Sequence, residues 1–286
     1  MKEIKLSKCE WTEIEKVHLE YCRSKITSKV PSLTQEQEEL LFIKNPFNKR
    51  MKIKIDYLPL RKIDLQNEYE NFTSYKKEWC RYKLIKALNI DVCPYCGQQY
   101  FSVVKNKDDA IIAEATFDHY FDKATYPFLA LNLYNLIPVC KNCNTSFKST
   151  RPEKVINPHF KALENNIRFK IVNHQISNYL EEEELDLIVE NLAVGQDFDL
   201  VENHLDVLCI KDRYKYYQGI IRSIIYKRQS YENGRIKELI NLMDDMGFNI
   251  TEQEIENMLI NQDIFGENEP FQKFKKDIWI QLSSCL

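Results

Sequence analysis

The spacing of apolar residues predicts helices toward both ends of the chain. Residues 10–43 have the helical repeat with a break inside it, and Ser32 or Thr34 is placed to cap the second of two helices. Residues 66–89 predict one long amphipathic helix, and residues 205–245 predict further helices. We expect a last helix in the terminal segment "FQKFKKDIWIQL".

The middle of the chain has a different pattern, of short strands and turns. The segments "QQYFSVV" and "AIIAEATF" predict a hairpin whose loop is "KNKDD", and "FKIV" indicates a later strand. Apolar and basic residues alternate in "MKIKIDYL", within residues 44–62, which favours a short strand with one basic face. The sequence therefore predicts an α+β protein with mainly helical arms and a small irregular centre.

Composition narrows the class of protein. The 286 residues are 44% apolar, enough for one large domain or two modest ones, and the net charge of −3 gives no global signal for polyanion binding. Only 6 glycines occur, and no glycine-rich phosphate loop is present, which argues against a nucleotide-binding fold. No apolar run approaches the roughly 20 residues that span a bilayer, so we expect a cytoplasmic protein without a membrane partner.

Four of the 9 cysteines form two C-x-x-C pairs, which are Cys93 with Cys96 and Cys140 with Cys143. Thiols stay reduced in the cytoplasm, so a metal site is a better interpretation than disulfides. Each C-x-x-C turn presents two sulfurs to one side of an ion, and two such turns complete the tetrahedral shell that Zn²⁺ prefers. The alternative is two unrelated turns with buried thiols.

The segment between the two cysteine pairs contains an adjacent aspartate and histidine. Asp118 and His119 lie in "ATFDHYFDKATYPF", and the second pair is embedded in "NLIPVCKNCN". An isolated Asp-His pair carries little information, because a histidine at a strand end is usually a surface residue. Here the pair lies between two zinc half-sites, and this combination is specific.

In this order and spacing, the motifs of residues 90–150 resemble the HNH endonuclease family. The resemblance implies a ββα-metal unit in which residues 115–119 end the first strand, residues 136–139 lie on the second, and a helix begins near residues 140–144. Zinc then braces a unit that is too small to be held together by apolar burial. The expected fold is α+β, with this core embedded in helical arms.

The resemblance also assigns roles to four residues of the core. Asp118 and Asn144 offer hard oxygen ligands for a catalytic Mg²⁺ or Mn²⁺. His119 is the general base that takes a proton from water, a task suited to a group that titrates near neutral pH. Asn135 ties the loop between the strands and so orients His119. A plain helix cap is the alternative for Asn144.

Further residues near the motif are less specific. Lys148 and Arg151 are placed to neutralise phosphates of a nucleic acid, and the alternative is that both are solvated charges. His159 is expected to be structural or to contact substrate. Asp122 departs from the family, which often has proline three residues after the histidine, and this weakens the expectation for the geometry of that loop.

Charge is concentrated in three segments, whatever the overall balance. Residues 44–62 hold seven basic residues against one aspartate, residues 211–228 are basic and tyrosine-rich, and residues 181–206 hold ten acidic residues without lysine or arginine. The two basic segments are candidates for a DNA track, and solvated faces are the alternative for all three segments. The acidic run is then expected to face away from DNA, toward a partner protein.

Beyond the core, "CPYC" after a helix, "YPFLALNLYNLIPVC" and the terminal "FQKFKKDIWIQL" resemble the HNH subunits of Septu-type and retron-associated anti-phage defence systems, which act beside an ATPase. The resemblance implies a DNA endonuclease, acting on double-stranded DNA, with an ATPase partner. Two alternatives stay open, namely an inactive zinc-stabilised binding module and an RNA-cleaving nuclease. We expect three regions: residues 1–89, the core at 90–160, and residues 161–286.

Overall fold

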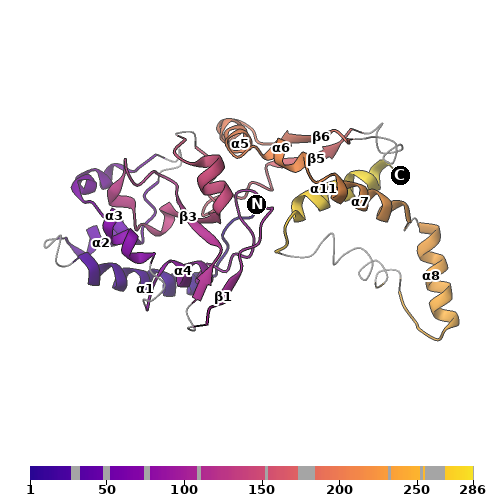
Figure 1. The fold of residues 1–286 in the computed structure, drawn as a ribbon, viewed down its shortest axis with the longest axis horizontal. Coiled ribbons are helices and arrows are strands. Elements are labelled where there is room, and N and C mark those ends of the chain that lie inside the picture. Colours follow the sequence, from indigo (N-terminus) through magenta and orange to yellow (C-terminus); the bar gives the residue numbers. More distant parts are fainter. Residues whose placement is uncertain are drawn as a thin grey trace. The chain divides into compact units, whose positions relative to one another are not determined.

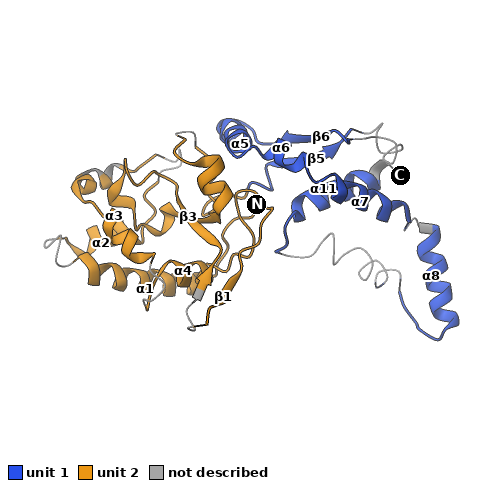
Figure 2. Ribbon diagram, in the orientation of Figure 1, with its two compact units in different colours: residues 1, 163–286 blue, residues 2–162 orange. Residues whose placement is uncertain are grey.

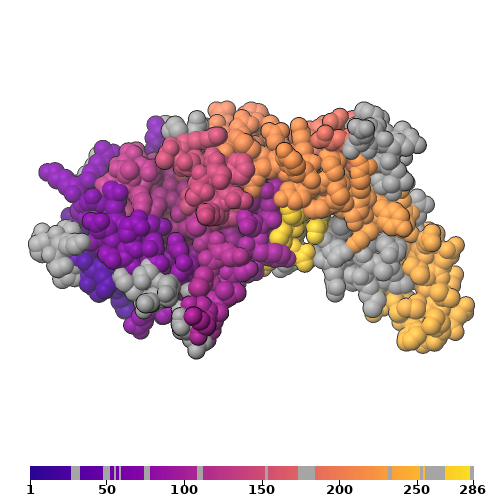
Figure 3. Space-filling view, viewed as in Figure 1, coloured from indigo at the N-terminus to yellow at the C-terminus, as the bar shows by residue number. Residues whose placement is uncertain are grey.

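The computed structural model describes residues 1–26, 33–47, 52–73, 78–107, 111–151, 154–172, 184–230, 233–251, 254 and 268–285. The chain forms two compact units. The first unit in chain order, residues 2–162, is drawn in orange as unit 2 in Figure 2, and the second unit, residues 163–286 together with Met1, is drawn in blue as unit 1. The predicted boundary after residue 160 lies close to this division, whereas residues 1–89 and 90–160 belong to the same unit. Figure 3 shows the surface of both units.

Two of the predicted N-terminal helices are present in the first unit (Figure 1). They are α1 (Lys8–Ile26) and α2 (Gln35–Phe42), and they pack against each other. The hydroxyl of Thr34 accepts a hydrogen bond from the Gln37 N–H, and the Gln37 side chain accepts one from the Thr34 N–H. This reciprocal capping box confirms Thr34 as the cap; Ser32 lies outside the described residues.

The prediction of one helix over residues 66–89 is wrong. The structure has two short helices instead, α3 (Gln66–Phe72) and α4 (Arg81–Ala87). The hydroxyl of Thr73 donates to the carbonyl of Glu70 at 2.7 Å, at the point where α3 ends. A threonine hydroxyl competes with backbone N–H groups for the carbonyl oxygens of the preceding turn, and this competition favours the end of the helix at this position.

The prediction of a basic strand in "MKIKIDYL" is also wrong. Ile53 forms a single bridge with Phe47, and the chain then enters the 3₁₀ helix η1 (Ile55–Lys62). Pro59 lies inside η1 and has no N–H to donate to a sheet. Tyr57 and Leu60 of η1 are buried, so burial every third residue replaced the expected alternation.

The predicted hairpin is confirmed. Strands β1 (Val103–Lys105) and β2 (Ile111–Ala113) pair antiparallel, with Val104 opposite Ile112. Part of the "KNKDD" loop, residues 108–110, lies outside the described residues.

The two strands expected from the motif also pair as predicted. Strands β3 (Ala115–His119) and β4 (Leu136–Cys140) are antiparallel, with Asp118 opposite Ile137. Two short 3₁₀ helices, η2 (Pro127–Leu129) and η3 (Leu133–Asn135), lie in the connection between them. After β4 the chain forms the π-helix η4 (Asn142–Lys148), so a helical segment begins where it was expected.

Buried histidines hold the connection between β3 and β4, and the first residue of β4, in place. His18 contacts the carbonyl oxygen of Leu131 through Nε2 at 2.8 Å, and His159 contacts that of Leu136 through Nε2 at 3.0 Å. Burial lowers the pKa of both histidines to about 4, so both are neutral at pH 7 and their Nε2–H groups donate. His159 therefore has the structural role that was one of its two expected roles.

The second unit combines a two-stranded sheet with helices. Strand β5 (Ile167–Ile171), predicted from "FKIV", pairs antiparallel with β6 (Leu187–Asn191). The described helices that follow are α5 (Gln196–Val207), α6 (Ile210–Lys215), α7 (Gln218–Ser230), α8 (Asn233–Asp245) and α11 (Gln272–Cys285). Strand β6 and α5 occupy much of the acidic run; some of their apolar side chains, including Leu187 and Val201, are buried, whereas Ile188 and Phe198 are exposed.

Side chains of α11 satisfy the backbone of β5. Asp277 accepts a hydrogen bond from the Phe169 N–H at 3.0 Å, and its other oxygen pairs with Lys273 at 2.7 Å. The amide of Gln281 accepts from the N–H of Ile171 and donates to its carbonyl oxygen. The molecule is thus a mixed fold of helices and small antiparallel sheets, as predicted, and no described helix could cross a bilayer.

Candidate metal and catalytic sites

The four predicted cysteines come together at one point. Their Sγ atoms lie within 4.8 Å of one another, and all four residues are buried. The Sγ atoms of Cys96 and Cys140 are 3.9 Å apart. Zn–S bonds of about 2.3 Å in a tetrahedron require S–S distances of about 3.8 Å, so the cluster fits a zinc ion.

The local fold explains how the two C-x-x-C segments present their sulfurs. Residues 93–97 form a tight turn in which the Gly97 N–H donates to the Cys93 carbonyl oxygen, and Gly97 has φ of 64°, which favours glycine. The second pair spans the end of β4 and the start of η4. The Cys140 N–H points at the sulfur of Cys93 at 3.3 Å, so the two segments also contact each other directly.

Asp118 is buried at 3% exposure, and both of its carboxylate oxygens have partners. The Tyr95 hydroxyl donates to Oδ2 at 2.7 Å, and the Lys148 ammonium binds Oδ1 at 2.8 Å. Burial raises the pKa of Asp118, while the charge of Lys148 and both hydrogen bonds oppose that rise. Tyr95 comes from the first cysteine turn and Lys148 from η4, so three segments meet at this carboxylate.

His119 follows Asp118 on β3 and is held by the backbone. Its Nε2 lies 3.0 Å from the carbonyl oxygen of Ala130, which can only accept, so Nε2 carries the proton. The ring of Tyr69 packs edge-on against the imidazole, with centroids 4.4 Å apart. Burial lowers the pKa of His119 to about 4, below the near-neutral value expected from sequence. The imidazole is therefore neutral at pH 7, with the lone pair on Nδ1.

The two asparagines of the motif have different surroundings. Asn135 is fully buried, and its amide accepts from the Phe121 N–H and donates to the carbonyl oxygens of Phe121 and Leu129. It thus fastens the chain just after His119. Asn144 donates from Nδ2 to Thr116 and to the Phe117 carbonyl oxygen, both at 3.1 Å. These two bonds fix the amide and leave Oδ1 as its remaining polar atom.

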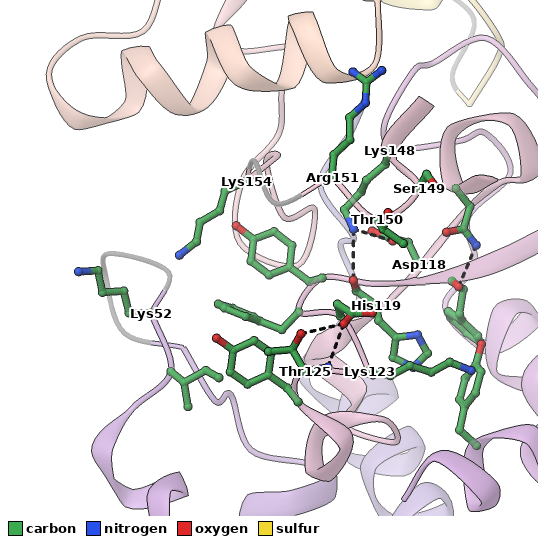
Figure 4. A pocket seen from close by; sticks show the side chains of 18 of the residues that line it. Lys52, Asp118, His119, Lys123, Thr125, Lys148, Ser149, Thr150, Arg151 and Lys154 are labelled. Atoms are coloured by element: carbon green, nitrogen blue, oxygen red, sulfur yellow. Dashed lines mark hydrogen bonds and ion pairs between the residues drawn. The ribbon is translucent and has the colours of Figure 1, made fainter. Parts of the chain in front are cut away.

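Asp118, His119 and Asn144 line one pocket of about 820 Å³ (Figure 4). Asp122 is the other carboxylate among its described lining residues, and it accepts two hydrogen bonds from Thr125 that close a turn. The cationic residues of the lining are more numerous: Lys52, Arg61, Lys123, Lys148, Arg151 and Lys154. An excess of positive charge in a pocket attracts anionic ligands such as phosphates.

The structure shows where Lys148 lies without a ligand. Its ammonium is buried in an ion pair with Asp118 and also donates to the His119 carbonyl oxygen at 3.3 Å, so the expected contact with a phosphate stays a prediction. A buried carboxylate needs a partner, and η4 supplies the nearest cation. Arg151 is exposed at the pocket wall, and its guanidinium points away from Asp118 in Figure 4.

Sequence reasoning missed Tyr95, Tyr69 and Ala130, although all three touch the motif. Tyr95 carried a usable signal, because a tyrosine between two zinc ligands must lie next to whatever the zinc unit supports. The carbonyl of Ala130 carried none, since every residue has one. The basic segment at residues 44–62 contributes Lys52 and Arg61 to the pocket, in keeping with the local charge noted there.

Searches of protein-family models, of curated proteins and of solved structures find nothing that matches this chain.

Proposed function

We propose that the protein is a metal-dependent endonuclease of the HNH type that hydrolyses phosphodiester bonds of DNA. The observation that carries the proposal is the placement of Asp118, His119 and Asn144 around one basic pocket, directly beside a buried four-cysteine cluster. A binding module needs no neutral imidazole beside a buried carboxylate in such a pocket.

His119 is the general base of the proposed reaction. Its Nδ1 holds a lone pair because Nε2 donates to Ala130, and this bond also fixes the plane of the ring. A water molecule bound at Nδ1 can give up its proton as it attacks the phosphorus. Asn135 keeps the backbone of Phe121, two residues after His119, in place, so the imidazole ring has little freedom to turn away.

The cation of the reaction would take two oxygen donors of the pocket, one of which, Oδ1 of Asp118, binds Lys148 in this structure. Oδ1 of Asp118 and Oδ1 of Asn144 are hard ligands, which suits Mg²⁺ or Mn²⁺ better than zinc. When bound, such an ion stabilises negative charge on the phosphate and on the leaving oxygen. The cysteine cluster has a separate, structural role in this proposal, since its four sulfurs are buried and lie close enough together to bind one zinc ion.

The substrate and partner follow from charge and from the resemblance. Six cationic residues among the described lining of the pocket, of which Lys148 pairs with Asp118 and Lys123 with Glu70, support a polyanionic substrate. The family resemblance favours double-stranded DNA. By the same resemblance, we propose that the chain is the nuclease of an anti-phage defence system and acts with an ATPase subunit. The chain has no phosphate-binding glycine loop of its own, which fits a division of labour between two subunits.

The test is cleavage of a supercoiled plasmid by the purified, zinc-loaded protein with Mg²⁺ or with EDTA, with and without any ATPase encoded next to it. We expect cation-dependent nicking or linearisation. His119→Ala should reduce it by roughly two to four orders of magnitude while zinc content and melting temperature stay unchanged. Full activity of His119→Ala would reject the assignment of the base.

One observation favours the alternative of an inactive zinc-stabilised binding module. The ammonium of Lys148 already neutralises Asp118, as expected if this carboxylate were purely structural. Under this alternative the protein binds DNA without cleaving it, and Asp118→Asn leaves binding unchanged. Parallel assays with a structured RNA separate the remaining alternative, an RNA-cleaving enzyme, from the DNA endonuclease.

A further inference from the structure

The inference starts from the way Asp118 is held. Its Oδ2 accepts a hydrogen bond from the hydroxyl of Tyr95, which is fully buried. Its Oδ1 forms an ion pair with Lys148, whose side chain is 8% exposed. Tyr95 stands between two ligands of the cysteine cluster, so its position is fixed by that cluster. Lys148 stands at the end of η4 and is itself one of the residues that line the pocket.

We propose that Lys148 and Tyr95 set the cation affinity of Asp118 in opposite directions. Tyr95 holds the carboxylate in one orientation and so favours binding. Lys148 is the resident counter-ion of Oδ1, and a divalent cation has to displace it, because two positive charges on one carboxylate oxygen repel each other. This inference rests on the proposed function, since it concerns the cation site of the same pocket.

Displacement gives Lys148 a second position within its reach. Its ammonium also contacts the carbonyl oxygen of His119 at 3.3 Å, on the wall of the pocket (Figure 4). Released from Asp118, it can stay on that carbonyl and face the substrate phosphate beside the base. Lys148 is therefore a positioning residue before the cation binds and contacts the phosphate afterwards, which reconciles its burial with its place in the motif.

The second unit offers a matched control. Asp277 is also buried, with one oxygen on Lys273 at 2.7 Å and the other on the N–H of Phe169 at 3.0 Å. The arrangement is the same, one cation and one neutral donor, but it fastens α11 to β5. Lys273→Met thus removes the counter-ion of a buried aspartate that has no proposed cation site.

The experiment measures Mn²⁺ binding from the electron paramagnetic resonance signal of free Mn²⁺, and melting temperature with and without Mn²⁺, on full-length zinc-loaded protein. Lys148→Met should bind Mn²⁺ at least tenfold more tightly than wild type. It should melt earlier without Mn²⁺, because Asp118 is left unpaired, and recover with Mn²⁺. Cleavage at saturating Mn²⁺ should nevertheless be slower. Lys273→Met should melt earlier without recovery and keep the wild-type affinity.

Tyr95→Phe should change the Mn²⁺ affinity in the opposite direction. It should bind Mn²⁺ several-fold more weakly with zinc content unchanged, whereas Tyr57→Phe, which removes a hydroxyl bonded to the Lys44 carbonyl oxygen, should not alter Mn²⁺ binding. Equal Mn²⁺ affinity in wild type and Lys148→Met, or weaker binding in the variant, overturns the inference. If wild type and Asp118→Asn bind Mn²⁺ equally, the proposed cation site itself fails. A Lys148→Met protein that folds only with Mn²⁺ supports the inference.

Discussion

Each of the two units buries an aspartate against a lysine, and the comparison separates a structural ion pair from a candidate site. The Asp277–Lys273 pair lies within α11, and the other oxygen of Asp277 joins this helix to β5 by accepting a hydrogen bond from the Phe169 N–H. The Asp118–Lys148 pair adjoins a neutral imidazole, a basic pocket and a metal-type cluster. Burial and pairing are therefore not evidence of function; the neighbours of the pair are.

The largest expected difference between the units is their dependence on zinc. Cys93→Ser should prevent stable folding of residues 2–162, because the free energy of metal binding contributes directly to folding. Cys209→Ser, in the second unit, should leave metal content and melting unchanged, since Cys209 is outside the cluster. Metal analysis and calorimetry of both variants test this. Purified wild-type protein without zinc, or unaltered melting of Cys93→Ser, would contradict it.

The second prediction concerns the two aspartates themselves. Asp118→Asn should lower cation-dependent cleavage by at least two orders of magnitude, because the amide is a poorer ligand for a hard cation. Asp277→Asn should instead lower stability by about 1.5–3 kcal/mol, because it weakens a hydrogen bond to a charged group and unpairs a partly exposed lysine, without a change in cleavage by the folded protein. Single-turnover cleavage and urea denaturation distinguish the two variants. If both variants lost cleavage activity to the same extent, the distinction between a candidate site and a structural ion pair would be wrong.

Acid should destabilise the unit that contains the candidate site. The pKa values of His18 and His159 are about 4 in the folded protein, against about 6.5 for a free histidine, so the unfolded chain binds more protons between these values. Stability is present above pH 6.5 and is lost as pH falls toward 4, with roughly 1.4 kcal/mol per pH unit for each histidine. Urea midpoints at pH 7, 6 and 5 measure the slope, and His159→Gln should reduce it.

The smallest expected effect concerns the salt dependence of DNA binding. Replacing Arg151 and Lys154 by glutamine should reduce the slope of log affinity against log salt by about two, without altering the single-turnover rate at saturation. From sequence, the same change is expected for Lys227 and Arg228, although the guanidinium of Arg228 packs over the ring of Trp279. If the Lys227 and Arg228 variant has an unchanged salt slope, these two residues belong to an ordinary solvent-exposed helix face. If the variant loses ATPase binding instead, this face contacts the ATPase.

The sequence was sufficient where a motif constrains both spacing and chemistry. The cysteine cluster and the pairing of β3 with β4 follow from the two C-x-x-C pairs and the intervening Asp118–His119 segment. Prediction from sequence failed where a local interaction determines the secondary structure. The helix expected over residues 66–89 ends at Phe72, beside the hydroxyl of Thr73, and burial every third residue overrode the alternation before Tyr57.

Within the site, the residue types were predictable but their bonds were not. Lys148 was placed near the motif, yet the sequence could not show that the buried Asp118 is its partner rather than a phosphate. The low pKa of His119 depends on burial by Tyr69 and other distant residues, and local sequence does not report such burial. Side-chain direction and desolvation are three-dimensional properties.

The contact between α11 and β5 has a consequence for synthesis of the chain. Asp277 lies 108 residues after Phe169, whose N–H donates a hydrogen bond to its carboxylate. At about 5–20 residues per second, the ribosome needs on the order of 5–20 s to make that stretch. Throughout this time one edge of β5 lacks the side chains that later cover it, and an open edge pairs readily with a neighbouring nascent chain. Truncation before α11 would make that exposure permanent and should yield aggregates rather than a shorter soluble protein.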